Sequence, residues 1–355
     1  MSPSEKLTSL GETSVPPLIV AELSGNHMGD FSIARALVKA AADAGADAIK
    51  LQTYTADTMT LPHRSGDFVI QDSTSLWYGR SLHDLYAQAA TPWEWHNELF
   101  DYARTLGLLA FSSPFDSTAV DFLDGLGVPC YKIASFELTD LPLIGYAASK
   151  NKPMILSTGM ATLSEIEDAV AVARERGASK IILLKCTSRY PASAEHCNLS
   201  TMANMATTFG CAVGFSDHTQ TIGSAVTAVA LGACMVEKHL VLDRNSNAVD
   251  AGFSADPDQF KQLVAACKEA WLARGTVVYG GSPEDVRERH YRRSLYISKD
   301  MKAGDVLSPE CLRIVRPGYG LLPKYYEKLI GTQVITDVSA GTALSWRHLM
   351  MRPDT

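Results

Sequence analysis

The chain has 355 residues, long enough for one large domain and a smaller one. Its formal net charge is −7 and its Arg-rich stretch, 287–293, also contains Glu288, so nucleic acid is not expected as a partner. No apolar run approaches membrane length and the first residues lack a secretory signal pattern, which predicts no membrane association. The seven cysteines show no CxxC spacing and fit free thiols in a reducing cytoplasm.

From residue 17 onward, short apolar strands alternate with amphipathic helices. The predicted strands cover 18–23, 48–53, 109–113, 130–135, 154–158, 180–186, 211–215 and 234–242. The clearest helices are predicted at 33–44, 163–176, 222–232 and 257–274. Strand–helix units of this number, in about 260 residues, predict an α/β fold of the (β/α)8 TIM-barrel type. An open doubly wound sheet is the alternative, but no Gly-rich phosphate turn follows the first strand.

Three segments depart from this alternation. Residues 1–15 are polar and are expected to be loosely ordered. A long insertion, 54–90, contains Trp77 and Tyr78, and its length indicates a functional loop at the barrel rim; a helical excursion covering the side of the barrel is the alternative. The sequence Thr-Pro-Trp-Glu at 91–94 predicts a helix with Thr91 as its N-cap.

The pattern changes after Arg274. A stretch with Gly-Gly-Ser-Pro is followed by short strands and turns, without a long helix. We therefore divide the chain into a barrel domain at 1–280, a linker at 281–293 and a small β-rich domain at 294–355.

Polar side chains stand at the C-terminal ends of the predicted strands, where a TIM barrel builds its active site. They are Glu22, Lys50, Ser113, Lys132, Ser135, Glu137, Ser157, Thr158, Lys185, Ser188, Ser216, His218 and His239. A barrel interior is normally apolar, so three lysines there need anionic partners and suit a ligand with a phosphate and a carboxylate. Structural salt bridges to Glu22, Glu137 or Glu237 are one alternative, and a Schiff-base lysine is another.

His218 and His239 end two consecutive strands that should run parallel. Both imidazoles would then face the same rim, where they could hold one divalent cation and leave positions open for substrate and water. Two hydrogen-bonded structural histidines are the alternative. Cys186 also lies at a strand end, but no His is adjacent in sequence, so catalysis by its thiol is not expected.

The order of these motifs resembles the sialic acid synthase family, whose members condense phosphoenolpyruvate with an amino-sugar aldehyde to give a nine-carbon 2-keto acid. The residues that carry the resemblance are Ala21–His27, Tyr131–Glu137, Leu156–Met160, Ser216–His218 and Glu237–His239. The last domain, with Arg316-Pro317-Gly318, resembles the antifreeze-like (SAF) domain of that family.

Three further motifs resemble the pseudaminic acid synthases within the family. They are Thr91–His96, Phe111–Asp116 and Leu184–Pro191. This implies condensation of phosphoenolpyruvate with 2,4-diacetamido-2,4,6-trideoxy-L-altrose and water to give pseudaminic acid and phosphate. N-acetylneuraminate and legionaminic acid synthases are the alternatives, followed by a Schiff-base aldolase and a non-enzymatic carbohydrate-binding protein. The sequence departs from the family at 247–249, where relatives usually have a Gly-rich stretch before Asp250.

The resemblance also implies roles for individual residues. His218 and His239 would bind a divalent cation, Mn²⁺ with Mg²⁺ or Co²⁺ as alternatives, and together with Glu22 and Lys132 would be catalytic. Phosphoenolpyruvate would be held by Lys50, Ser113, Lys132, Ser135, Ser157, Lys185, Ser188 and Ser216. The sugar would be bound by Glu22, Glu137 and Asp250, and Tyr190 would also bind substrate. Arg316 would reach the sugar from the other subunit of a domain-swapped homodimer.

Overall fold

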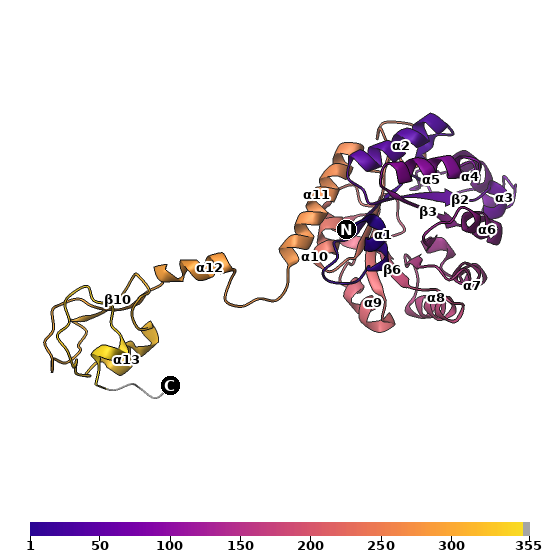
Figure 1. Cartoon of the computed structure of the whole chain (residues 1–355). Coiled ribbons are helices and arrows are strands. Elements are labelled where there is room, and N and C mark those ends of the chain that lie inside the picture. The colour runs from indigo at the N-terminus through magenta and orange to yellow at the C-terminus, as the bar shows by residue number, and fades with distance from the viewer. Residues whose placement is uncertain (351–355) are drawn as a thin grey trace. The chain divides into compact units, whose positions relative to one another are not determined.

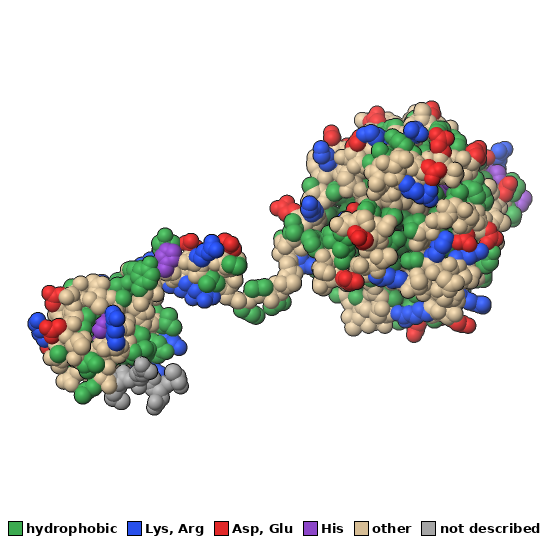
Figure 2. All heavy atoms as spheres, in the orientation of Figure 1, with side chains coloured by type: hydrophobic (Ala, Val, Ile, Leu, Met, Phe, Trp, Pro, Cys, Tyr) green, Lys and Arg blue, Asp and Glu red, His purple; other side chains and the backbone are tan. Residues whose placement is uncertain are grey.

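The computed structural model describes residues 1–350. The chain divides into two compact units, Met1–Gly275 and Thr276–Thr355, each with its own hydrophobic core (Figure 1). On the visible face of the first unit, Figure 2 shows charged side chains of both signs intermixed. Among residues 1–350, no helix combines the length and apolar character needed to cross a membrane.

Eight parallel strands close a barrel in the first unit, in the order of the sequence. They are β1 (Leu18–Glu22), β2 (Ala48–Thr53), β3 (Leu109–Pro114), β4 (Tyr131–Ile133), β5 (Met154–Ser157), β6 (Ile181–Cys186), β7 (Ala212–Asp217) and β8 (Met235–His239). The barrel closes where β1 pairs with both β2 and β8, so that Glu22 lies opposite Lys50 on one side and His239 on the other. The prediction of a (β/α)8 barrel is confirmed.

Helices surround the strands (Figure 1). They are α1 (Pro3–Thr8), α2 (Phe31–Asp43), α3 (Ala56–Met59), α4 (Leu82–Ala89), α5 (Trp95–Thr105), α6 (Ser117–Gly125), α7 (Leu141–Ala148), α8 (Leu163–Glu175), α9 (Thr201–Phe209), α10 (Gly223–Ala230) and α11 (Pro257–Arg274). Polar caps fix where several begin: Asp30 caps α2, Thr162 forms a capping box with Glu165 on α8, and Asp256 caps α11.

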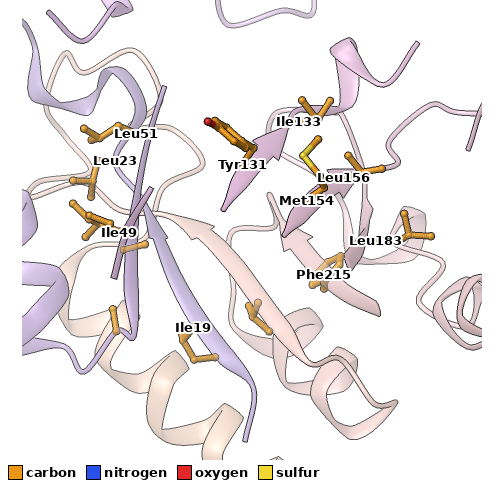
Figure 3. Close-up of a cluster of buried hydrophobic side chains, with 14 of the residues drawn as sticks. Ile19, Leu23, Ile49, Leu51, Tyr131, Ile133, Met154, Leu156, Leu183 and Phe215 are labelled. Atoms are coloured by element: carbon orange, nitrogen blue, oxygen red, sulfur yellow. The ribbon is translucent and has the colours of Figure 1, made fainter. Parts of the chain in front are cut away.

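Alternation along the strands builds two apolar layers. Side chains such as Ile19, Leu156 and Phe215 point outward to the helices and form the larger core cluster (Figure 3). Side chains of the opposite phase, such as Val20 and Ile182, fill the barrel interior near the N-terminal ends of the strands. Toward the C-terminal ends, the same inward phase carries polar residues, which places them together at one rim.

Residues 1–15 are not the loosely ordered segment that their polarity predicted. Ser2 caps α1, and Leu7 and Leu10 are only 3% and 2% exposed. Both pack into the interior cluster of the barrel, and Lys6 pairs with Asp47 at 2.7 Å. The segment covers apolar residues of the barrel interior. Burying each leucine stabilises the fold by about 2 kcal/mol, which outweighs the tendency of the polar residues to remain in solvent.

The helix predicted to begin after Thr91 begins instead at Trp95. Thr91 is buried and its Oγ1 lies 3.2 Å from Nε2 of His27, so the hydroxyl is engaged away from a helix N-terminus. The residues between form a turn, in which the Trp95 amide donates to the Pro92 carbonyl.

The second unit contains short elements around a small core. They are α12 (Pro283–Arg287), η5 (Glu288–Tyr291), β9 (Ser294–Ile297), β10 (Leu312–Val315), η6 (Pro323–Tyr325), α13 (Tyr326–Leu329) and η7 (Trp346–His348). β9 and β10 pair antiparallel, and isolated bridges such as Met301–Val338 join the remaining extended segments. Much of the stretch predicted as linker is helical, because Ser282 forms a capping box with Asp285 that begins α12.

Candidate active site

Four buried charged residues meet at the C-terminal ends of β1, β2, β4 and β8. Lys50 Nζ lies 2.7 Å from Glu22 Oε2 and 3.1 Å from Glu237 Oε1. Lys132 Nζ donates to the same Glu237 oxygen at 3.2 Å, and so does the Ser216 hydroxyl. Two cations therefore share one carboxylate inside the barrel, and we call Glu22, Lys50, Lys132 and Glu237 the charged cluster.

Burial and mutual attraction set the ionisation of the charged cluster. Burial alone would raise the pKa of Glu237, but Lys132 and Lys50 hold it well below its usual range, so this carboxylate stays ionised. Burial by itself would lower the pKa of Lys50, but attraction to Glu22 and Glu237 more than offsets this effect, so the pKa is raised. For Lys132 burial is only partly offset by Glu237, and its pKa is lowered.

Hydroxyl groups line the rim beside the charged cluster. Ser157 Oγ is buried without a hydrogen-bond partner, and Ser135 Oγ accepts from the Gly159 amide at 3.1 Å. A Cβ on residue 159 would stand 2.1 Å from Ser188 Oγ and 2.8 Å from Ser135 Oγ, so only glycine lets these two hydroxyls converge. Ser113 Oγ lies 3.5 Å from Lys50 Nζ.

Lys185 lies apart from the other two lysines. On β6, Leu184 points into the barrel and Leu183 points outward to the helices. Lys185 is two residues after Leu183, so its side chain also points outward. Its Nζ donates to the Cys186 carbonyl at 3.0 Å, and within residues 1–350 it forms no ion pair with a carboxylate.

The two histidines lie side by side, with ring centroids 5.4 Å apart. His218 Nδ1 lies 3.0 Å from the Thr187 carbonyl, which leaves Nε2 as its ligand atom. His239 Nδ1 is buried and has no hydrogen-bond partner among residues 1–350, and Asp250 Oδ2 lies 3.6 Å away, longer than a hydrogen bond. Within residues 1–350 there is no group of three or more His, Cys, Asp or Glu side chains placed to hold a metal. An orphaned, buried imidazole nitrogen beside a second imidazole fits a two-histidine cation site completed by substrate and water.

Cys186 contacts His218, although no histidine adjoins it in sequence. Its Sγ lies 3.8 Å from His218 Nδ1. Burial raises the pKa of Cys186, but His218 more than offsets this and leaves it at about 7. Burial lowers the pKa of His218, and the Cys186 thiolate turns the net shift upward. The Cys186 thiol therefore contacts the Nδ1 side of the His218 imidazole and raises its pKa from there.

Aromatic rings and the loop after β8 enclose the histidine pair. Tyr190 packs at 4.5 Å from His218, and Phe253 at 4.8 Å from His239. Asn26 holds the loop: its Oδ1 accepts from the Asp250 amide at 3.3 Å, and its Nδ2 donates to the Leu240 carbonyl. These two bonds fix the loop that contains the 247–249 departure, with Asp250 facing His239.

Glu137 and Arg316 are the remaining residues that the sequence analysis assigned to the site. Glu137 follows β4 in η3 (Ser135–Glu137), and its Oε2 is buried without a partner. Burial raises the pKa of this carboxyl to about 7. Arg316 is exposed in the second unit, directly after β10.

Residues 37–279 match the NeuB family model, and residues 292–350 match the SAF domain model. The chain belongs to the NeuB family. It is 44% identical to the pseudaminic acid synthase of Helicobacter pylori over 93% of this chain and 97% of that one. It is 34% identical to the N,N'-diacetyllegionaminic acid synthase of Legionella pneumophila, over 95% and 96% of the two chains.

A solved structure of a NeuB-type enzyme is also similar. The N-acetylneuraminic acid synthetase of Leptospira borgpetersenii, in complex with citrate, superposes with a TM-score of 0.70 at 30% identity. The match covers 78% of this chain and 91% of that one.

Sequence reasoning left out two features of this NeuB-family site. Glu237 entered as part of a family motif and as a possible salt-bridge partner, without a role in the site, yet it accepts from three side chains. Its phase on β8, two residues before His239, was the signal that could have found it. Phe253 belongs to no strand end, and no pattern in the sequence marks it.

Proposed function

We propose that this NeuB-family chain is a pseudaminic acid synthase. The reaction joins phosphoenolpyruvate, 2,4-diacetamido-2,4,6-trideoxy-L-altrose and water to give pseudaminic acid and phosphate. The observation that carries the proposal is the charged cluster beside a histidine pair at the mouth of the barrel. The similarity to pseudaminic acid synthases over nearly the whole chain selects this member of the family.

Phosphoenolpyruvate carries a phosphate and a carboxylate, and both find donors around the charged cluster. Lys50 and Lys132 supply charge-assisted hydrogen bonds. The hydroxyls assigned to the same ligand are Ser113, Ser135, Ser157, Ser188 and Ser216. The unpartnered Ser157 Oγ supports this, because a buried hydroxyl without a partner is costly until a ligand arrives. Lys185 is left out because it has the outward phase and donates to a carbonyl.

His218 and His239 would hold a divalent cation, with Mn²⁺ as our choice over Mg²⁺ and Co²⁺. When bound, the cation would polarise the aldehyde of the open-chain sugar. Glu137 and Asp250 would bind the sugar's polar groups, with Tyr190 against the ring. Tyr190 and Asp250 lie against the histidine pair, whereas Glu137 lies near enough to Lys132 and Lys50 to feel their charge, so it would stand where the two substrates meet.

The reaction then needs one new C–C bond, one water and one leaving group. C3 of phosphoenolpyruvate bonds to C1 of the sugar as the C2–C3 double bond opens and the aldehyde oxygen takes up a proton. Water adds to the electron-poor C2 while Glu22 accepts its proton. The bond between C2 and the phosphate oxygen then breaks, phosphate leaves with that bonding pair, and the hydroxyl on C2 loses its proton to become the keto group. Lys132 and Lys50 stabilise the departing anion, so positioning and electrostatics carry much of the catalysis.

We further propose a domain-swapped homodimer in the cytoplasm, in which Arg316 of one chain reaches the barrel of the other. A guanidinium held by a second subunit can bind an N-acetyl carbonyl or a hydroxyl of the sugar. The exposed position of Arg316 leaves it available for such a contact.

A Schiff-base aldolase is the second candidate, because the lowered pKa of Lys132 is what an amine nucleophile needs. The test is phosphate release from phosphoenolpyruvate with the altrose derivative and Mn²⁺. We expect release to need all three and to be lost in EDTA and in His239→Ala. A borohydride-trapped adduct on Lys132, or full activity in EDTA, contradicts the synthase mechanism.

A further inference from the structure

Trp77 connects the rim insertion to two parts of the site that are far away in sequence. Its Nε1 donates a hydrogen bond to the Val249 carbonyl at 3.2 Å. Its ring lies 6.1 Å from that of Tyr190, centroid to centroid. The neighbouring Leu76 approaches Gly252, where a Cβ would stand 3.5 Å from Leu76 Cδ1. The insertion therefore packs on both sides of Asp250 in the loop after β8.

The contacts of Tyr190 place this indole on the histidine side of the site. Tyr190 lies between Trp77 and His218, 4.5 Å from the imidazole, and 4.9 Å from Phe253. Trp77 has no contact with the charged cluster among the interactions of its ring and indole nitrogen within residues 1–350. A change at Trp77 should therefore reach one substrate and spare the other.

We propose that Trp77 is the specificity-determining wall of the sugar subsite and that, together with Asn26, it positions the Asp250 loop. The inference rests on the proposed function. An indole offers a large, rigid apolar face that packs well against methyl groups of acetamido and 6-deoxy substituents. A sugar with a hydroxyl in place of the C6 methyl would have to desolvate that group against the ring. Discrimination by an apolar pocket changes the ratio of kcat/KM values for two substrates by about ten- to two-hundred-fold.

Two variants separate the ring from its hydrogen bond. Trp77→Phe keeps an aromatic face and loses the bond to the Val249 carbonyl, and Trp77→Ala loses both. Tyr78→Ala is the matched control, because Tyr78 is adjacent and 59% exposed. Steady-state kinetics give KM for the sugar and for phosphoenolpyruvate separately, with the 6-deoxy altrose derivative compared with N-acetylmannosamine.

We expect the sugar KM to rise about threefold in Trp77→Phe and at least tenfold in Trp77→Ala, with the phosphoenolpyruvate KM within twofold of wild type. The preference for the 6-deoxy sugar should fall about tenfold in Trp77→Ala, and Tyr78→Ala should match wild type. An unchanged sugar KM in both Trp77 variants, or an equal rise in both substrates' KM, overturns the inference.

Fluorescence gives a second readout that needs no turnover and that serves if Trp77→Ala fails to fold. The emission of wild type minus that of Trp77→Phe isolates Trp77 among the five tryptophans. We expect this difference to change on adding the altrose derivative alone and to stay constant on adding inorganic phosphate. A sugar response equal in both proteins contradicts the inference. If wild type releases no phosphate with any sugar, the proposed function itself has failed.

Discussion

Glu237 and Lys132 form an ion pair across the mouth of the barrel, with Oε1 3.2 Å from Nζ and both side chains at most 4% exposed. Their strands, β8 and β4, do not pair with one another, so the contact spans the barrel interior. Because Lys50 shares the same oxygen, removing this carboxylate would leave two buried cations, of which Lys50 keeps its ion pair with Glu22 and Lys132 loses the one it makes with Glu237.

Glu237→Gln should therefore destabilise the fold, lowering the free energy of unfolding by about 3–5 kcal/mol. Inorganic phosphate should raise the melting temperature of this variant more than that of wild type, since an anion replaces the lost charge. Urea unfolding and thermal melts measure both effects. Asp337→Asn is the control: it breaks an exposed pair with Lys302, which solvent screens, and should leave the free energy of unfolding nearly unchanged. Equal stability of Glu237→Gln and wild type contradicts the role assigned to Glu237.

Cys186→Ser should shift cation binding toward lower pH. Burial lowers the pKa of His218, but the Cys186 thiolate raises it above its ordinary value, so protons compete with the cation as pH falls through that raised pKa. Serine carries no such charge, hence the pKa of His218 falls and its lone pair stays available at lower pH. Mn²⁺ titration calorimetry from pH 5.5 to 8 measures the shift. Loss of all activity at every pH would instead indicate catalysis by the thiol.

Glu137→Gln should flatten the dependence of stability on pH. Burial raises the pKa of Glu137 to about 7, from the 4.5 of an exposed glutamate. Between these values the folded chain keeps a proton that the unfolded chain has released, so wild-type stability falls as pH rises through this window. The loss is about 3 kcal/mol by pH 8 and should be absent in Glu137→Gln. Parallel stability–pH curves for the two proteins, measured by urea unfolding, would count against a buried neutral carboxyl.

Mixing two inactive chains tests the swapped dimer. Arg316→Ala and His239→Ala homodimers should both be inactive, and heterodimers should recover activity because one composite site regains both residues. The expected recovery is about a quarter of wild-type activity at equal mixing, since half the dimers are mixed and each has one intact site. No recovery after confirmed subunit exchange would mean that Arg316 acts within its own chain or not at all.

Much of the barrel was predictable from apolar periodicity. β2 spans the predicted 48–53, and α11 spans the predicted 257–274. The period of two along strands also separates residues that point inward from those that point outward. On β6, this alternation predicts that Lys185 points outward, away from Lys50 and Lys132, and that Cys186 points into the barrel. On β8, it predicts that Glu237 points into the barrel and belongs to the site.

Other features depend on contacts that no local pattern encodes. Leu7 and Leu10 are two apolar residues in a polar segment, and only the closed barrel provides the cavity that buries them. The Trp77–Val249 hydrogen bond joins residues 172 positions apart, and it exists because the rim insertion folds back over the loop after β8. Thr91 looked like a helix cap, and a buried histidine far away in sequence competes for its hydroxyl.

The measurement that tests the account most directly is the kcat/KM for phosphate release from phosphoenolpyruvate with three sugars under identical conditions. The sugars are 2,4-diacetamido-2,4,6-trideoxy-L-altrose, its D-mannose-configured counterpart from legionaminic acid synthesis, and N-acetylmannosamine. The account predicts a preference for the altrose derivative of at least about tenfold over either of the others. A clear preference for N-acetylmannosamine, or release that does not depend on the sugar, would contradict it.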